Sequence, residues 1–295
     1  MTLTLLPPGQ GRLASESIAF ADRLNGWIYG ARTYVTHDGG RSWKEEHLPG
    51  FVSALTTGGG AAWATVNKCG QCAHPRPYVA HAASNSWSPA AAPPGFEAYQ
   101  PLIAIDAKTA LADGYSKVAP VGLFLTTNAG KNWRAVGRCK PELQTDSVSA
   151  TALDTQNLWL ICGDQASMTD QVNYLYRSSD GGVSWQLVAA NPRPLQHLPT
   201  IGNLPNQGYI PGLTVLRGGQ LFLTPRKMGL IARSDDGGTT WTVQLQDDGG
   251  GGYVLQFVSE SVGFALSVQG LYRTLDGGWH WSQMICRQRP CLQKP

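Results

Sequence analysis

Six tryptophans recur along the chain at similar intervals, and most of them end the same short motif. The motif, called the box below, reads Ser/Thr-x-Asp/Asn-x-Gly-x-x-Trp. Four copies with Asp span residues 36–43, 178–185, 234–241 and 274–281, and a copy with Asn spans 126–133. A sixth copy, 80–87, keeps only its tryptophan. The intervals from Trp43 to Trp87, Trp133, Trp185, Trp241 and Trp281 are 44, 46, 52, 56 and 40 residues. Such a period is typical of one β-propeller blade.

The residue types of the box predict a hairpin turn with a structural role for each side chain. An Asp or Asn oxygen can accept hydrogen bonds from N–H groups of the turn, and glycine adopts the positive φ of a tight hairpin. The tryptophan is expected to open the next strand and to bury its ring between neighbouring sheets. The structural box residues are therefore Asp38, Asn128, Asp180, Asp236, Asp276, Trp43, Trp133, Trp185, Trp241 and Trp281.

The boxes resemble the Asp-box, or BNR, repeats of sialidase-like propellers and of photosystem II stability and assembly factor-like proteins. The resemblance covers residues from about 17 to 285. It implies a β-propeller in which the boxes are structural, so the box aspartates are not candidates for catalysis.

Short alternating segments precede each box and predict four strands per repeat, as in residues 17–22, 26–30, 32–36 and 43–48. We expect an all-β, six-bladed propeller of four-stranded antiparallel blades, forming a single domain over residues 1–295. The blades are expected at about 17–48, 52–90, 102–137, 147–189, 208–246 and 253–285. Residues 2–6 could add an edge strand to the last blade or be the remnant of a seventh, which leaves a seven-bladed alternative open.

Strand direction predicts two faces with different connections. Tight turns and boxes emerge on one face, the box face, and long connections emerge on the other, the long-loop face. Connections longer than about 12 residues often carry function. The candidate ligand-binding residues are on or near the long connections: His74, Arg76, Tyr99, Tyr115, Lys117, Arg138, Asp164, His197 and Arg226. Basic and aromatic side chains together suit an acidic protein segment or a sugar acid.

Six cysteines form an even set at positions 69, 72, 139, 162, 286 and 291. An even number favours disulfides, although six cysteines allow fifteen pairings. A Cys139–Cys162 bridge between adjacent connections is expected first. Cys69-x-x-Cys72 also has the spacing of a redox or zinc motif, and Asp247-Asp248 could bind calcium, but no full ligand set accompanies either, and no metal or cofactor is predicted.

Disulfides favour a secreted or periplasmic protein. The first residues, Met1-Thr-Leu-Thr-Leu-Leu-Pro-Pro, lack the charged region and long apolar region of a signal peptide, so an export signal is expected to be absent from this sequence. No apolar run is long enough to span a membrane. The net charge of +3 and the scattered Lys and Arg argue against nucleic acid as a partner.

Two classes of function fit these features. The first is a non-catalytic recognition or assembly module, expected to be a monomer, that binds a protein or carbohydrate ligand through the long-loop face. The second is a glycoside hydrolase or polysaccharide lyase of sialidase-like type. The Arg-Ile-Pro segment of sialidases does not occur, and Glu45 and Glu46 follow a box on an outer strand, where no active site is expected. Carboxylates such as Asp164, Asp170, Glu97 and Glu142 leave the enzyme alternative open. The first class is favoured.

Overall fold

The computed structural model describes residues 17–68, 75–96, 102–116, 119–139, 145–164, 171–191, 201–205, 212–225, 229–247 and 251–286. Within these ranges all 25 regular elements are β-strands, and none is a helix that could cross a membrane. The strands form six sheets, which confirms the predicted all-β, six-bladed propeller of four-stranded antiparallel sheets. The chain divides into two compact units, Met1–Arg138 and Cys139–Pro295, with three sheets each.

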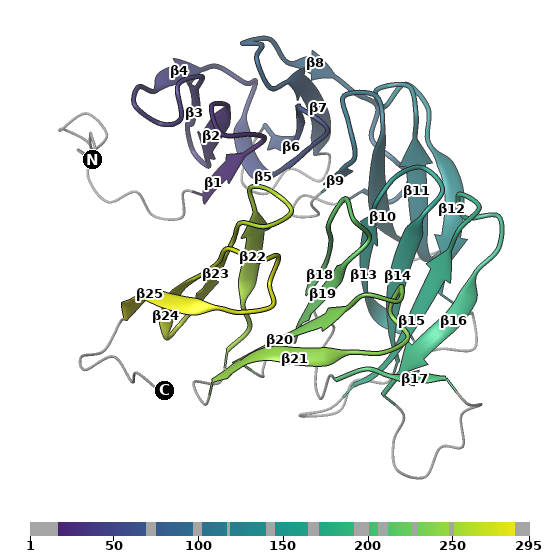
Figure 1. Cartoon of the computed structure of the whole chain (residues 1–295). Coiled ribbons are helices and arrows are strands. Elements are labelled where there is room, and N and C mark those ends of the chain that lie inside the picture. Colours follow the sequence, from purple (N-terminus) through teal and green to yellow (C-terminus); the bar gives the residue numbers. More distant parts are fainter. Residues whose placement is uncertain are drawn as a thin grey trace. The chain divides into compact units, whose positions relative to one another are not determined.

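In the first unit each sheet is an antiparallel meander whose strands follow chain order (Figure 1). The first sheet contains β1 (Ser17–Phe20), β2 (Gly26–Tyr29), β3 (Thr33–Thr36) and β4 (Lys44–Glu46). The second contains β5 (Phe51–Gly58), β6 (Ala61–Asn67), β7 (Arg76–His81) and β8 (Ser88–Pro89). The third contains β9 (Ile103–Ala104), β10 (Ala110–Ser116), β11 (Ala119–Thr126) and β12 (Arg134–Arg138).

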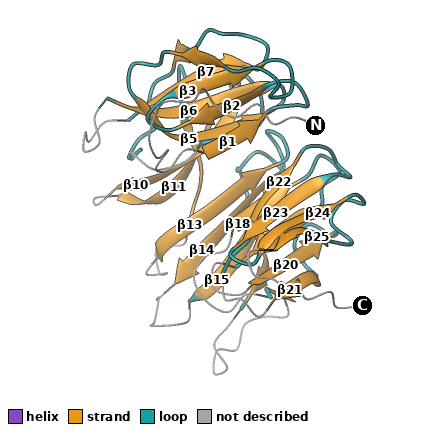
Figure 2. Cartoon of the chain, turned by 90° about the vertical axis from the view of Figure 1, so that its left-hand side faces the viewer, coloured by secondary structure: helices purple, strands orange, loops and turns teal. Residues whose placement is uncertain are grey.

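The second unit repeats this arrangement with one addition, a short parallel strand at the edge of its first sheet (Figure 1). As in the first unit, its described elements are strands joined by loops (Figure 2). That sheet contains β13 (Thr145–Ala152), β14 (Leu158–Asp164), β15 (Val172–Ser178), β16 (Gln186–Ala190) and the added β17 (Gly202–Asn203). The next contains β18 (Gly212–Val215), β19 (Leu221–Thr224), β20 (Gly229–Ser234) and β21 (Thr242–Asp247). The last contains β22 (Val254–Phe257), β23 (Gly263–Ser267), β24 (Gly270–Thr274) and β25 (Ser282–Cys286).

Burial within a blade follows strand position. The second strands β6 and β19 are buried along their whole length, and β14 is buried except at its last residue, in agreement with their nearly continuous apolar sequences. The fourth strands β4 and β21 are mostly exposed or half-buried and carry charged and polar residues. In these sheets the inner strands are therefore buried, and the outer strand is more exposed to solvent.

The box turns have the hydrogen bonds expected of them, as the copy at residues 178–185 shows. The Ser178 hydroxyl donates to Asp180 Oδ1 over 2.8 Å and accepts the Gly182 N–H over 2.8 Å. Asp180 also accepts the N–H of Ser184 over 2.9 Å and its hydroxyl over 2.6 Å. Gly182 has a φ of 84°, which favours glycine. The same bonds recur around Asp38 and Asp236.

A second turn, between the first and second strands, is bonded to the box turn of the same blade. Asp154 Oδ1 accepts the N–H groups of Gln156 and Asn157 over 2.7 and 2.8 Å, and Gly181 of the box donates its N–H to the Gln156 carbonyl over 3.0 Å. Gly39 makes the equivalent bond to the Leu24 carbonyl. The two kinds of turn therefore lie on one face, as predicted from strand direction.

Neighbouring blades of a unit contact each other through aromatic rings. Trp27 of β2 packs edge-on against Trp87 with ring centroids 5.9 Å apart, and Trp63 of β6 packs in the same way on Trp133 at 6.2 Å. Phe257, adjacent to Trp281 in the last blade, packs on Phe222 of β19. The box tryptophans are half-buried and lie one residue before the fourth strand, so the fourth strands begin slightly later than predicted.

The neighbouring serines 178 and 179 provide a direct test of the box. Replacing the buried Ser178 with Ala leaves the Gly182 N–H without its acceptor, so Ser178→Ala is expected to lower the free energy of unfolding by about 1–3 kcal/mol. Ser179 is exposed, and Ser179→Ala is the matched control, with no expected change. Urea unfolding of both variants measures the difference; equal stabilities would contradict this role of the hydroxyl.

The lowered pKa values of the box carboxylates predict that the protein loses stability in acid. The Ser184 hydroxyl holds the pKa of Asp180 at about 2, the His280 N–H does the same for Asp276, and the Ser42 hydroxyl holds the pKa of Asp38 well below its usual range. Because these values lie below the unfolded value of about 3.9, the stabilisation is complete above that pH and is lost as pH falls towards about 2.

In the box at residues 126–133, Asn128 accepts the hydrogen bond of the turn with a side chain that does not titrate. Asparagine is therefore the substitution that tests the role of the box carboxylates. The Asp38→Asn, Asp180→Asn, Asp276→Asn triple variant is expected to lose less stability than the parent between about pH 4 and pH 2, because fewer carboxylates take up protons on unfolding. Urea unfolding across this range compares the two slopes. Identical slopes would show that the box carboxylates do not control acid stability.

Candidate functional site

Of the nine predicted ligand-binding residues, Arg76 and Asp164 have side chains that the structure describes. Arg76 begins β7 in the first unit, and Asp164 ends β14 in the second. Tyr115 and Arg138 belong to β10 and β12, but their side chains lie outside the description. His74, Tyr99, Lys117, His197 and Arg226 lie outside the described residues, as do Asp170, Glu97, Glu142 and the Cys69-x-x-Cys72 segment.

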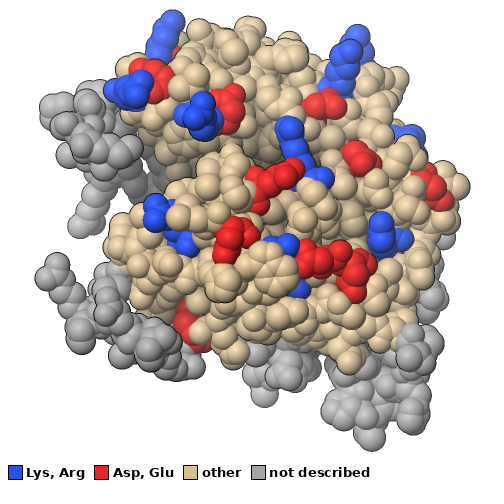
Figure 3. Space-filling model, in the orientation of Figure 1, with Lys and Arg blue, Asp and Glu red and all other residues tan. Residues whose placement is uncertain are grey.

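Charges on the described surface alternate in sign and do not form one dense patch in the view of Figure 3. The described part of the chain has no group of three His, Cys, Asp or Glu residues that could hold a metal ion. Asp247, considered for calcium from the sequence, accepts a hydrogen bond from the Tyr253 hydroxyl, while Asp248 lies outside the described residues.

Arg76 lines a cavity of about 240 Å³ in the first unit, called the Arg76 cavity. Its other lining residues are Pro49, Val66, Lys68 and Tyr78. Lys68 follows β6, Arg76 begins β7, and both are exposed, so the cavity opens on the long-loop face. The structure thus brings Arg76 together with an aromatic ring and a second cation, as the candidate site requires.

A second cavity of about 250 Å³ adjoins the first, because Pro49 and Tyr78 line both. We call it the Glu46 cavity. It runs along the outer strand of the first blade towards the worn box of the second blade, and its lining residues are Lys44, Glu45, Glu46, His47, Leu48, Pro49, Tyr78, Asn85 and Trp87. The two cavities together are the β4–β7 groove.

Local sequence explains why the groove forms there. The connection from β4 to β5 passes so close to the end of β6 that a Cβ on Gly50 would lie 2.1 Å from the Asn67 carbonyl oxygen. Only glycine permits this approach. Pro49 is held beside Val66 and Tyr78 as a result, at the point where the two cavities meet.

Glu46 was expected from the sequence to lie on an outer strand away from any site. It does lie on the outer strand, but its side chain is only 9% exposed. Its Oε2 accepts the indole N–H of Trp27 over 3.2 Å and that of Trp87 over 2.9 Å. Its Oε1 is buried and has no hydrogen-bond partner. A carboxylate therefore joins two blades and lines a cavity, and no motif in the sequence signals this arrangement.

Charges at the two ends of the groove differ. Lys68 and Arg76 make the Arg76 cavity basic. In the Glu46 cavity the buried carboxylate is accompanied by Glu45, whose side chain forms a 3.7 Å ion pair with Arg32, and by the exposed Lys44 and His47. Charged side chains thus line both ends of the groove, and the Tyr78 ring and Pro49 lie between them.

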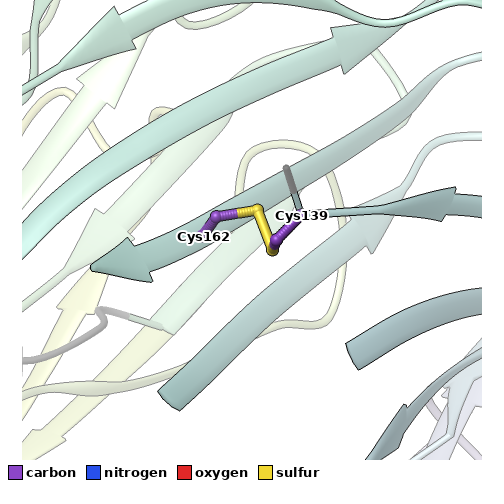
Figure 4. The surroundings of a disulfide bond; sticks show 2 residues. All are labelled: Cys139 and Cys162. Carbon is purple, nitrogen blue, oxygen red and sulfur yellow. A yellow bond between two sulfur atoms is a disulfide. The ribbon is translucent and has the colours of Figure 1, made fainter. Parts of the chain in front are cut away.

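The second unit contains the disulfide predicted first from the sequence, between Cys139 and Cys162 (Figure 4). Both cysteines are buried among Leu160, Val172 and Tyr174. The bond closes a segment with a sequence separation of 23 residues. It ties the residue after β12 to β14, which fits its predicted role of fixing a connection.

Comparison with known proteins supports the fold class. No family model matches the chain, and no curated protein does. A solved structure described as YCF48 bound to D1 peptide is similar at a TM-score of 0.54 with 17% sequence identity, over 90% of this chain and 79% of that chain. YCF48 from Cyanidioschyzon merolae is similar at a TM-score of 0.51 with 19% identity, over 90% of this chain and 83% of that chain. The likeness is one of fold, the β-propeller.

The hydrogen bond from Trp87 to Glu46 can be compared with an equivalent bond to a neutral acceptor. Trp87→Phe removes a bond to a carboxylate, with an expected loss of about 1.5–3 kcal/mol, whereas Trp133→Phe removes a bond to the Ala91 carbonyl, with an expected loss of about 0.5–1.5 kcal/mol. Urea unfolding measures both. A loss of stability at Trp87 no larger than that at Trp133 would be evidence that the bond to Glu46 is no stronger than a bond to a backbone carbonyl.

Proposed function

We propose that this propeller is a non-catalytic recognition module that binds an extended, acidic protein segment through the long-loop face of its first unit. The observation that carries the proposal is the Arg76 cavity, where two cations lie beside a tyrosine ring on a face open to solvent. The peptide named in the description of one YCF48 structure supports a protein ligand for a fold of this kind.

The lining of the Arg76 cavity suits a peptide in two ways. Arg76 can hold a carboxylate with two parallel N–H donors, and Lys68 adds a second positive charge. Tyr78, Pro49 and Val66 offer apolar surface to the adjacent part of the segment. Aromatic residues and arginine carry much of the binding energy in protein interfaces. A sugar acid offers the same carboxylate and is the competing ligand.

A hydrolase or lyase is the second candidate and has less support. Two carboxylates line the groove. Glu46 is held by two indoles and is largely buried, so it is poorly placed to exchange protons with a substrate, and Glu45 forms an ion pair with Arg32. The buried Cys139–Cys162 bond supports our further proposal of a secreted or periplasmic location. The hydrogen bonds of the boxes support membership of the Asp-box propellers.

Binding to peptides graded in net charge tests the proposal. The Lys68→Gln, Arg76→Gln double variant is expected to lose affinity for acidic peptides by about tenfold, since each removed cation costs a fraction of the binding free energy. The control is Arg23→Gln, Arg41→Gln, which removes the same charge from exposed residues on the box face and is expected to bind normally. A peptide array and titrations with the best peptide measure the effect.

The alternatives have distinct results in the same series. Equal loss in both variants would mean that net charge, and not the cavity, controls binding. Saturable binding of polygalacturonate with no peptide binding would replace the protein ligand by a sugar acid. Turnover of a fluorogenic glycoside panel would overturn the non-catalytic part of the proposal.

A further inference from the structure

We infer that the Glu46 cavity is a second subsite, which takes the cationic side chain of a lysine or arginine from the same extended segment. The inference rests on the proposed function and extends it from a basic site for an acidic residue to a groove with two oppositely charged subsites. Its ligand is defined by chemistry as a guanidinium or ammonium group on a flexible stem.

The buried carboxylate is the first argument. Glu46 is nine-tenths buried, and its hydrogen bonds from the neutral indoles of Trp27 and Trp87 reach the same oxygen. Within the described residues its other oxygen has no partner, and no lysine, arginine or histidine forms an ion pair with it. A buried carboxylate without an ion-pair partner is unfavourable, so a positive charge brought next to it in the adjoining cavity is stabilised.

The lining of the cavity is the second argument. Trp87 and Tyr78 present aromatic rings, and cations bind over such rings. Leu48 and Pro49 add apolar surface that suits the methylene stem of a long basic side chain. An acidic ligand group would instead approach the Glu46 carboxylate and be repelled.

Lys44 and His47 also line the cavity and must be considered as competing charges. Both are exposed, and Lys44 is free to extend into water. Glu45 is engaged with Arg32 at the rim. A guanidinium from a ligand is less strongly hydrated than an ammonium and presents several donors in a plane, which favours it over Lys44 as the occupant. Lys44 is therefore expected to weaken binding of a cation without preventing it.

The two subsites are close enough for one segment. Pro49 and Tyr78 border both cavities, so a chain that crosses Tyr78 reaches each of them. Successive side chains of an extended peptide point to opposite sides, and residues two apart point to the same side. The preferred segment thus has an acidic and a basic residue with the same orientation.

Small probes test the cavity without requiring peptide binding. N-acetyl-arginine amide is titrated against the whole protein while the indole N–H signals of Trp27 and Trp87 are followed by NMR, with the Trp87→Phe variant used for assignment. N-acetyl-citrulline amide, nearly the same shape but neutral, is the matched probe. We expect saturable shifts of the Trp87 signal with the arginine probe and at least about tenfold weaker binding of the citrulline probe.

Two variants with opposite expected effects complete the test. Glu46→Gln is expected to weaken arginine binding about tenfold, and Lys44→Gln is expected to strengthen it severalfold by removing a like charge. Equal binding of both probes, or a Lys44→Gln variant that binds the arginine probe more weakly, would overturn the inference. Because Lys44 is exposed, its variant remains informative if Glu46→Gln fails to fold.

The results also separate this inference from the proposed function. Arginine binding at the Glu46 cavity without any acidic peptide binding would support the cation subsite and sink the proposed function. Acidic peptides could instead bind through Lys68 and Arg76 with no preference for a nearby basic residue, while the arginine probe leaves the Trp87 signal unchanged. That result would support the proposed function and overturn the cation subsite.

Discussion

The interaction on which the structure depends is the hydrogen-bonded pair formed by the first and third residues of the box. In five boxes a buried Ser or Thr hydroxyl donates to the Asp or Asn side chain two residues later. The same hydroxyl accepts the N–H of a glycine four residues on. The hydroxyl acts both as a donor and as an acceptor, so the turn has one favoured geometry. That geometry determines where the tryptophan lies and thus how the next contact between blades is made.

The fold could be predicted from the sequence because its determinants are local. A box, its tryptophan and the alternating segments before it all lie within one repeat; the box occurs five times, and a sixth copy keeps only the tryptophan. The turn containing Asp154 could also have been found, since Asp-x-x-Asn occurs twice before a second strand, at Asp22–Asn25 and Asp154–Asn157. The disulfide was predictable because Cys139 and Cys162 adjoin connections that the repeat places side by side.

The groove could not be predicted to the same extent, because its residues come from separate parts of the repeat pattern. Trp27 precedes Glu46 by 19 residues, and Trp87 follows it by 41. From the sequence alone, a glutamate after a box is expected to be an exposed residue of the outer strand. The side chain of Glu46 is buried because two blades pack around it. Arg76 was predicted as a ligand-binding residue because it lies beside a long connection. Lys68 and Tyr78 could be added to the candidate site only once the structure placed them in the same cavity.

The worn box at residues 80–87 has an additional consequence. Ala82 stands where other boxes have Asp or Asn, and its side chain cannot accept the turn's hydrogen bonds. The tryptophan of this box, Trp87, donates its indole N–H to Glu46 of the preceding blade. The last turn of the second blade is thus energetically linked to a residue outside that blade. A molecule that interacts with the Glu46 carboxylate changes the local opening equilibrium of this turn as well as occupying a cavity.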